Sequence, residues 1–356
     1  MTADAVGGVW NYALELIRAL PDHDFALAVM GPRMSDDQRA EVAALPNVKL
    51  FACTYALEWM DGPWEQVDRS GDWLLGIAAE FRPDLVHLNG YSHAVLPFGA
   101  PVIVVAHSCV LSWWQAVKKT TAPPQYSEYR RRVTAGVHAA ALVLAPSEAM
   151  LNSLRINYDF RGAGRVIPNA RDAALFTAQE KMANILAAGR VWDEAKNIAV
   201  LDTIAARVRW PVEVAGDALH PNGSSVALRN VRALGVLSSE ELREHLASSA
   251  IFVLPARYEP FGLSALEAGL SGCALVLGDI PTLREIWGDA ALFVRPDDRA
   301  GLERELNRLI RDEFLRSELA QKARARAEEY SPQRMIDGYL QAYADCSEPK
   351  ASQAAA

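Results

Sequence analysis

The sequence predicts two doubly wound α/β domains, each built on a parallel sheet that is covered by helices. The chain has 356 residues, too many for one ordinary core, and 51% of them are hydrophobic. Short apolar runs recur along the chain, and each is followed by a turn and then by a segment with helical periodicity. This alternation is typical of parallel strands joined by crossover helices.

The first half of the chain opens with a helix and continues with apolar runs that we interpret as strands. The stretch 7–20, GGVWNYALELIRAL, needs a strand before it to complete the first βα unit, but only residues 1–6 precede it. We therefore expect either a very short first strand or a chain that begins late. Residues 1–170 form the expected N-terminal domain, and its further strands are 25–31, 48–54, 84–90, 102–108 and 142–147.

The second half repeats the alternation after a linker near 168–175, where a proline and few helix signals occur. Residues 171–330 form the expected C-terminal domain. Two amphipathic helices follow over 313–344 and meet at Ser331 and Pro332, an N-cap and a first helical residue. We expect 331–345 to cross back to the N-terminal domain and 346–356 to be a flexible tail. The strands expected in this half are 184–190, 212–217, 231–236, 251–256, 273–279 and 291–296.

The composition argues against several classes of protein. A formal net charge of −8 disfavours general affinity for nucleic acid, and the run 130–132 reads either as a solvated helix face or as a local anion-binding patch. The four cysteines show no C-x-x-C spacing, which argues against disulfides and structural zinc. No apolar run reaches about 18 residues and no basic-then-apolar leader opens the chain, so we expect a cytoplasmic protein.

The candidate site residues are those that directly follow the expected strands, because ligands of open α/β sheets bind beyond the carboxyl ends of the strands. These residues are Gly7, Gly8, Asn89, Gly90, His107, Ser108, Ser147, Gly189, Arg190, Gly216, Asp217 and the turn 257–262.

The stretch 258–272, YEPFGLSALEAGLSG, places two glutamates at the two ends of a turn that leads into a helix. Ser264 and Glu267 have the spacing of a capping box, which explains Glu267 structurally but leaves Glu259 unexplained. The start of this helix also offers free backbone amides, which favour an anion such as phosphate.

Arg190 and Lys196 flank the turn after the strand 184–190 in the stretch GRVWDEAKN. Two cations there can neutralise a diphosphate without a metal ion. The alternative is ordinary surface charge, since Asp193 and Glu194 lie between them.

These motifs together resemble the retaining nucleotide-sugar glycosyltransferases of family four. The similarity is carried by GRVWDEAKN, EPFGLSALEA and GGVWNYALELIRAL, and two glutamates separated by seven residues are that family's diagnostic motif. The resemblance implies the GT-B fold, in which two Rossmann-like domains face each other across a cleft. It also implies transfer with retention of anomeric configuration, with the acceptor attacking on the face that the leaving group vacates.

The resemblance further implies roles for single residues. Arg190 and Lys196 would hold the donor diphosphate, Glu267 the ribose hydroxyls, and Glu259 would lie near the donor sugar. His107 matches the histidine at the reacting sugar, although a packed histidine at a strand end is the alternative. The other implied donor contacts are Gly7, Gly8, Gly216, Leu237, Phe261, Gly262, Leu263 and Ser264. The chain departs from the family at Ala170 and Ala218, where glycine is usual.

Acceptor contacts carry no transferable motif. We expect them at Trp10, Asn89, Trp113 and Trp114, and the last two form a cluster with Lys118 and Lys119 that can stack on a sugar, touch a membrane surface or simply pack. We assign no metal site, because the DHD stretch at 22–24 precedes a strand and so lies at the opposite edge of the sheet.

The expected function is transfer of a sugar from a nucleotide sugar, with UDP-glucose as the first guess, to a saccharide, lipid-linked or small-molecule acceptor in polysaccharide or glycoconjugate synthesis. No cofactor is expected beyond this co-substrate, and a weak peripheral membrane contact is an option. The alternatives are a sugar-nucleotide epimerase of the same fold, a two-lobed sugar-binding protein and a non-catalytic nucleotide-binding regulator.

Overall fold

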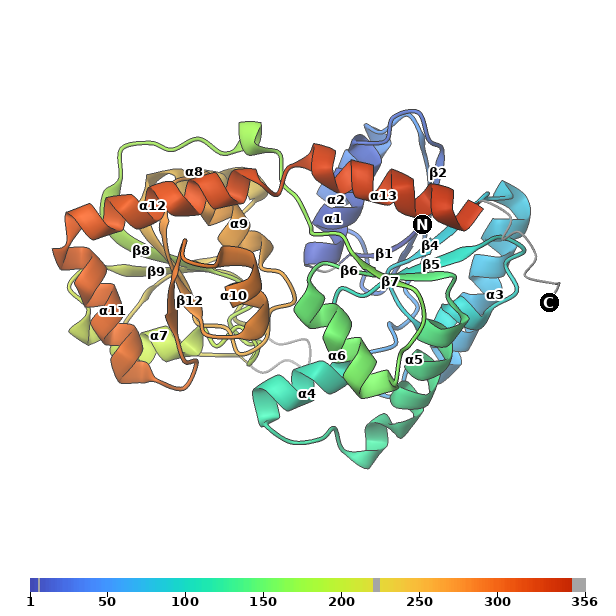
Figure 1. Cartoon of the computed structure of the whole chain (residues 1–356), viewed down its shortest axis with the longest axis horizontal. Helices are drawn as coiled ribbons and strands as arrows, with labels where there is room; N and C mark the ends of the chain where they lie inside the picture. Colours follow the sequence, from blue (N-terminus) through green and yellow to red (C-terminus); the bar gives the residue numbers. More distant parts are fainter. Residues whose placement is uncertain (6, 220–224, 348–356) are drawn as a thin grey trace, which may run out of the picture. The chain divides into compact units, whose positions relative to one another are not determined.

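The computed structural model describes residues 1–5, 7–219 and 225–347. The chain divides into two compact units (Figure 1). The first unit comprises Met1–Trp114, Thr120–Ala170 and the chain from Pro332 onward; the second comprises Gln115–Lys119 and Arg171–Ser331. The helix α13 (Pro332–Ser347) therefore belongs to the first unit although it follows the second in sequence.

The first unit contains two parallel sheets instead of one continuous sheet. Strands β1 (Thr2–Asp4), β2 (Phe25–Met30) and β3 (Val48–Ala52) form one, and β4 (Val86–Leu88), β5 (Val102–Val105), β6 (Leu142–Ala145) and β7 (Gly164–Val166) form the other. The first strand has three residues and pairs with β2. Asn89, directly after β4, joins the two sheets because its backbone N–H donates to Thr2 Oγ1 (2.9 Å) and its side-chain Nδ2 donates to the Thr2 carbonyl (2.6 Å).

Helices cover these sheets. The amphipathic helix α1 (Gly8–Arg18) and α13 pack together on a core that includes Leu14, Ile103 and Tyr339. A second core lies under α5 (Ser127–Ala139) and α6 (Glu148–Tyr158) and includes Val104, Val133 and Leu154. The other helices of this unit are α2 (Asp36–Ala43), α3 (Trp64–Phe81) and α4 (Val110–Lys118), whose last residues group with the second unit.

The second unit is built on a single sheet of parallel strands. In spatial order these are β10 (Arg232–Gly235), β9 (Val212–Ala215), β8 (Met182–Ala188), β11 (Ser249–Leu254), β12 (Ala274–Gly278) and β13 (Leu292–Val294). This is the strand order of a dinucleotide-binding fold, and it reverses between β8 and β11. Ligands of such sheets bind where the order reverses, beyond the carboxyl ends of those two strands.

Helices cover both faces of this sheet. The helices α8 (Ser239–Ser248), α9 (Leu263–Leu270), α10 (Pro281–Trp287) and α12 (Glu313–Glu328) pack on one core, which contains Phe252, Leu266 and Trp287. The helices α7 (Ala199–Ile204) and α11 (Arg299–Arg311) pack on the other (Figure 1). The sheet is buried on both faces, so its central strands are almost wholly apolar, as β11 illustrates with SAIFVL. The buried polar side chains within these strands, Asn184, Glu213 and Ser249, bond to one another near the amino ends of β8, β9 and β11. At the carboxyl ends the loops carry the polar groups.

Candidate active site

The loops that follow β8 and β11 are bonded to each other at the point where the strand order reverses. The backbone amides of Arg257 and Tyr258 both donate to the Ala195 carbonyl, at 2.8 and 3.3 Å. Asn197 ends the first loop with a φ of 55°, and its Nδ2 donates to the carbonyls of Pro255 and Pro296, each at 2.9 Å. Asparagine tolerates this left-handed conformation better than most residues. The two loops therefore form one backbone-bonded surface that presents their charged side chains.

Two glycines allow the backbones of neighbouring loops to touch at this edge. A Cβ at Gly216, whose φ is 144°, would lie 1.9 Å from the Gly189 carbonyl oxygen. The Gly189 amide bonds Ala215 O, and the Gly216 amide bonds Gly235 O at 2.7 Å. Any side chain at Gly216 would force these loops apart, so this glycine is needed to seat the loop that carries Arg190.

Arg190 lies at the start of the loop after β8, and its side chain is partly held by neighbours. Its Nη2 donates to Asp193 Oδ2 at 2.6 Å, and its guanidinium lies 5.2 Å from the centre of the Trp192 ring. Burial acts to raise the pKa of Asp193, but Arg190, Lys196 and the backbone amide of Ala195 together outweigh burial, and the pKa is lowered. The Nε of Arg190 is buried and has no hydrogen-bond partner in the described ranges. Buried donors are normally paired, so this atom is a natural contact for a bound acceptor group.

Lys196 and Glu259 connect the same two loops by an ion pair. The side chains are 21% and 9% exposed, so both charges are largely removed from water. The Glu259 backbone is held as well, since Thr282 Oγ1 donates to its carbonyl. Lys196, which we expected to bind the diphosphate, is therefore already neutralised by Glu259, which the resemblance places near the donor sugar.

The helix α9 starts differently from the sequence prediction. Its N-cap is Gly262, with a φ of 96°, and this residue has no side-chain capping bond, so the capping box expected from Ser264 and Glu267 is wrong. A left-handed residue at the N-cap turns the chain sharply, and helix starts leave the first amides, here those of Leu263 and Ser264, without intrahelical acceptors. Glu267 is instead held by Arg171, whose Nε lies 2.9 Å from Glu267 Oε1.

Two other expected donor contacts pack into the core of the second unit. Phe261 is 3% exposed, and its ring lies edge-to-face with Tyr330 at 5.5 Å. Leu237 is half-buried against the same core, and its neighbour Ser238 forms a capping box with Glu241 at the start of α8. Phe261 therefore supports the turn from inside, and Leu237 retains an accessible part for a ligand.

In the first unit, His107 and Asn89 belong to one polar cluster at the ends of β4 and β5. His107 Nε2 lies 2.9 Å from Asn89 Oδ1, and its ring contacts Tyr12 with centroids 4.5 Å apart. His87 lies behind them, with its Nε2 3.2 Å from the Tyr12 hydroxyl and its Nδ1 2.8 Å from the Tyr343 hydroxyl of α13. Burial lowers the pKa of both histidines to about 3, so both rings are neutral at pH 7.

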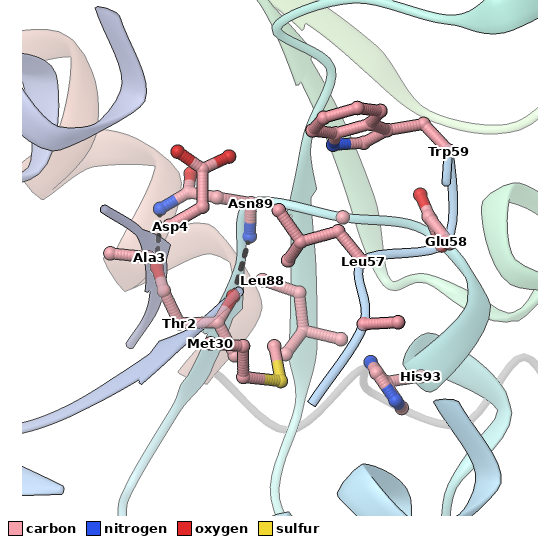
Figure 2. Close-up of a pocket in the computed structure, with 12 residues that line it drawn as sticks. Thr2, Ala3, Asp4, Met30, Leu57, Glu58, Trp59, Leu88, Asn89 and His93 are labelled. Carbon is pink, nitrogen blue, oxygen red and sulfur yellow. Dashed lines mark hydrogen bonds between the residues drawn. The ribbon is translucent and has the colours of Figure 1, made fainter. Parts of the chain in front are cut away.

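A pocket of about 60 Å³ opens beside this cluster (Figure 2). It is lined at the ends of β1 and β4 by Asp4 and Asn89, and by Glu58, Trp59 and His93 from the surrounding loops and turns. The Glu58 carboxylate accepts bonds from the backbone amides of Tyr91 and Ser92 and from the Ser92 hydroxyl, while Trp59 is 46% exposed. The described lining residues include two carboxylates and neither lysine nor arginine.

The tryptophans expected at an acceptor have different environments. Trp10 is 4% exposed in the core under α1, and its Nε1 donates to Glu41, so its ring is not available to an acceptor and that expectation is corrected. Trp113 and Trp114 are half-buried on α4 and pack edge-to-face at 5.8 Å. Gly7 and Gly8 are exposed at the start of α1, where Gly7 has a φ of 74°.

Some site residues had no signal in the sequence. Arg171 and Thr282 contact glutamates that are distant in sequence, Glu267 and Glu259, and only the glutamate of each pair carried a signal. A buried aspartate beside a motif arginine, as in Arg190–Asp193, was the one pair that the spacing alone offered.

Two further properties bear on the chemistry. Across the described ranges no group of three or more histidine, cysteine, aspartate or glutamate side chains is arranged to hold a metal ion. Of the helices in the described part of the chain, none combines the length and apolar character needed to cross a membrane.

Family models match most of the chain in two pieces. Residues 6–175 match Glycosyltransferase Family 4, and residues 183–312 match Glycosyl transferases group 1. Among curated proteins, a glycogen synthase of Mycobacterium tuberculosis is 29% identical over 281 residues, which is 71% of this chain and 66% of that protein. In two of the curated relatives the aligned part spans only 30% and 66% of the relative's length.

Solved structures show the same fold along nearly all of the chain. A sucrose-phosphate synthase from Thermosynechococcus elongatus superimposes with a TM-score of 0.79 at 19% identity, covering 97% of this chain and 95% of the other. HepE of Anabaena in complex with UDP-glucose superimposes with a TM-score of 0.74 at 17% identity, covering 97% and 98%. The expected GT-B fold is therefore confirmed.

Proposed function

Since the chain belongs to the group 1 glycosyltransferases, with a Family 4 match over its N-terminal half, we propose that it transfers a sugar from a nucleoside diphosphate sugar to an acceptor hydroxyl. We further propose a UDP-sugar as donor, UDP-glucose first, and retention of the anomeric configuration. The acceptor is a saccharide, a lipid-linked saccharide or a small molecule, and the product belongs to polysaccharide or glycoconjugate synthesis. UDP-glucose is bound in a solved structure of similar fold, which supports this choice of donor.

The observation that carries this proposal is the surface where β8 and β11 diverge. Arg190, Lys196 and the first amides of α9 gather at the position where this sheet topology binds nucleotides. The buried Nε of Arg190 has no partner in the described ranges, so a diphosphate oxygen would satisfy it. In this proposal Glu267 accepts hydrogen bonds from the ribose hydroxyls while Arg171 holds its other side.

The proposed mechanism follows from the charge that develops on the leaving group. Cleavage of the bond between the anomeric carbon and the diphosphate builds negative charge on the phosphate oxygens. Donors that are fixed at those oxygens stabilise the transition state more than the ground state. Arg190 and Lys196 supply two such cations, and their carboxylate partners Asp193 and Glu259 hold them in place before the donor arrives. We propose that these cations and the α9 amides stabilise the diphosphate without a metal ion or other cofactor.

The first unit contributes the acceptor side in this proposal. The pocket beside Asn89 offers the carboxylates of Asp4 and Glu58 and the exposed Trp59 (Figure 2). Carboxylates accept hydrogen bonds from hydroxyls and repel phosphate, whereas aromatic rings stack on sugars. The half-buried Trp113 and Trp114 are further proposed contacts, either with a sugar or with the surface of a membrane that carries a lipid-linked acceptor.

A binding and transfer experiment tests the proposal. Thermal shift against a panel of nucleotide sugars identifies the donor, since a ligand that binds only the folded state raises its stability. Incubation of that donor with and without an acceptor panel then separates transfer from epimerisation. We expect Glu267→Ala to weaken nucleotide binding and Arg190→Ala chiefly to slow transfer. Normal turnover by both variants would show that the site assignment is wrong.

A further inference from the structure

Asn89 holds its side-chain amide in one orientation at the junction of the two sheets of the first unit. Its Nδ2 lies 2.6 Å from the Thr2 carbonyl oxygen, which can only accept a hydrogen bond (Figure 2). The Nδ2 must therefore be the NH2 group, and Oδ1 must be the atom that faces the histidines. The backbone amide of Asn89 also donates to Thr2 Oγ1, but the orientation of the side-chain amide depends on the bond to the Thr2 carbonyl.

The fixed amide sets the proton positions on the ring that it contacts. Asn89 Oδ1 lies 2.9 Å from His107 Nε2, and an amide oxygen can only accept, so His107 Nε2 must carry the proton. His107 is neutral, which leaves Nδ1 deprotonated. The Nδ1 atom makes no hydrogen bond within the described part of the chain.

The groups behind this pair are consistent with the same proton arrangement. His87 Nε2 lies 3.3 Å from the same Asn89 oxygen and 3.2 Å from the Tyr12 hydroxyl, while Tyr343 lies 2.8 Å from His87 Nδ1. The Tyr12 hydroxyl donates to Tyr339 at 2.6 Å and is therefore free to accept from His87 Nε2. Tyr343 then donates to His87 Nδ1, and every hydrogen bond in this cluster has one donor and one acceptor.

We propose that Asn89 is a positioning residue that fixes His107 as the Nε2–H tautomer, so that His107 presents a hydrogen-bond-accepting Nδ1 to the substrate. This inference rests on the proposed function only for the identity of the substrate. A neutral imidazole nitrogen with a free lone pair accepts a bond from a sugar hydroxyl and gives nothing to a carboxylate or phosphate oxygen. Asn89 acts through His107 and needs no contact with the sugar.

The test is the protonation pattern of the His107 ring in the full-length protein. Long-range proton–nitrogen correlation spectra of protein labelled with nitrogen-15 histidine distinguish a protonated from a bare ring nitrogen, and His107→Gln assigns the signals. We expect wild-type Nε2 to be the protonated type and Nδ1 the bare type. A protonated Nδ1 in the wild-type protein would overturn the proposal, whether or not any variant folds.

Three variants separate positioning from a purely structural role. Thr2→Val removes the bond to the Asn89 backbone and should leave both His107 signals unchanged. Asn89→Ala removes the acceptor, and both nitrogen signals should move toward the average of a mixed tautomer. Asn89→Asp restores an acceptor oxygen and should return Nε2 to the protonated type. Unchanged His107 signals in folded Asn89→Ala, or changed signals in Thr2→Val, would contradict a positioning role for Asn89.

Substrate addition distinguishes failure of this inference from failure of the proposed function. Saturating UDP-glucose should shift the Nδ1 signal of His107 and leave the Nε2 signal in place. If UDP-glucose does not bind, the proposed donor is wrong, but the tautomer in the free protein still decides the role of Asn89. A shift confined to Nε2 on binding would overturn the assignment of Nδ1 as the substrate-facing atom.

Discussion

The two units place opposite kinds of chemistry at the ends of their strands. In the second unit the site is ionic, with the pairs Arg190–Asp193, Lys196–Glu259 and Arg171–Glu267. In the first unit the corresponding cluster is neutral, because burial holds His87 and His107 uncharged among an asparagine and tyrosines. In the proposed function this difference divides the roles of the two units: fixed positive charge suits a leaving diphosphate, whereas neutral acceptors and donors suit the hydroxyls of sugars.

The largest effect should come from removing a cation of the ionic site. In the proposed function Arg190→Ala deletes a donor to the leaving group, and comparable losses at oxyanion holes cost about 3 kcal/mol, so kcat should fall roughly a hundredfold. The exposed Arg311 on α11 is the matched control, and Arg311→Ala should leave kcat unchanged. A wild-type kcat in Arg190→Ala would show that the ionic site takes no part in the mechanism.

Substitutions in the Lys196–Glu259 pair should change stability and catalysis separately. Lys196→Met leaves Glu259 buried beside an apolar group, which should destabilise the second unit by about 2 kcal/mol and also slow transfer. Adding Glu259→Gln removes the unpaired charge. The double variant should recover much of the stability, measured by thermal unfolding, without recovering the rate. Recovery of both would mean that the lysine is only a structural partner.

The neutral cluster should make the first unit sensitive to acid. The folded pKa of His87 is about 3 against an ordinary 6.5, so the unfolded chain binds its proton first and stability falls as pH drops from 6.5 toward 3. The loss should be about 2 kcal/mol between pH 6.5 and about pH 5. His87→Gln should remove this contribution from the pH dependence of thermal unfolding, while His23→Gln, at an exposed site, should not. Equal slopes in all three proteins would contradict a neutral buried His87.

A smaller effect should follow from the backbone that starts α9. Gly262 has a φ of 96°, and an added Cβ would lie 3.2 Å from Leu283, so Gly262→Ala should destabilise the second unit by about 1–2 kcal/mol. It should also weaken UDP binding, because the α9 amides would move. Gly76 lies in the exposed interior of α3 with open space around it, and Gly76→Ala should instead stabilise by about 0.5–1 kcal/mol. Isothermal titration with UDP and thermal unfolding measure both effects, and an undisturbed Gly262→Ala protein would contradict the strained helix start.

The smallest effect should come from a helix cap away from the charged loops. Ser238 and Glu241 form a reciprocal capping box at the start of α8. Ser238→Ala should lower stability by about 1 kcal/mol and leave kcat unchanged. A large loss of activity in this variant would extend the site toward Leu237, one of the implied donor contacts.

The sequence predicts the strands well because the central strands are buried on both faces, and burial requires continuous apolar runs. The strand β7 was missed because GRV at 164–166 is a short edge strand without such a run. The motif residues Arg190, Lys196, Glu259 and Glu267 could be located because they lie at fixed spacing beside a strand end. Their partners could not all be found, because Arg171 reaches Glu267 only through the folded chain.

The errors have the same physical origin. The spacing of Ser264 and Glu267 satisfies a local capping rule, but the left-handed Gly262 moves the helix start and a distant arginine takes the carboxylate. The environment of Trp10 is also decided by tertiary contacts, and so is that of Asn89, whose role at the acceptor stays a prediction. The α1 core buries Trp10, whereas the junction between β1 and β4 places Asn89 against His107. Local sequence pattern predicts where helices and strands lie, while long-range contacts decide which partners each side chain meets.

The central claim is that side-chain cations and helix amides, with no divalent ion, bind the pyrophosphate of the donor on the second unit. Calorimetric titration of UDP into the full-length protein, with Mg2+ and then with excess EDTA, tests it most directly. We expect the same affinity in both buffers and strongly reduced affinity in Lys196→Met. Affinity that disappears with EDTA, or that survives in Lys196→Met, would contradict it.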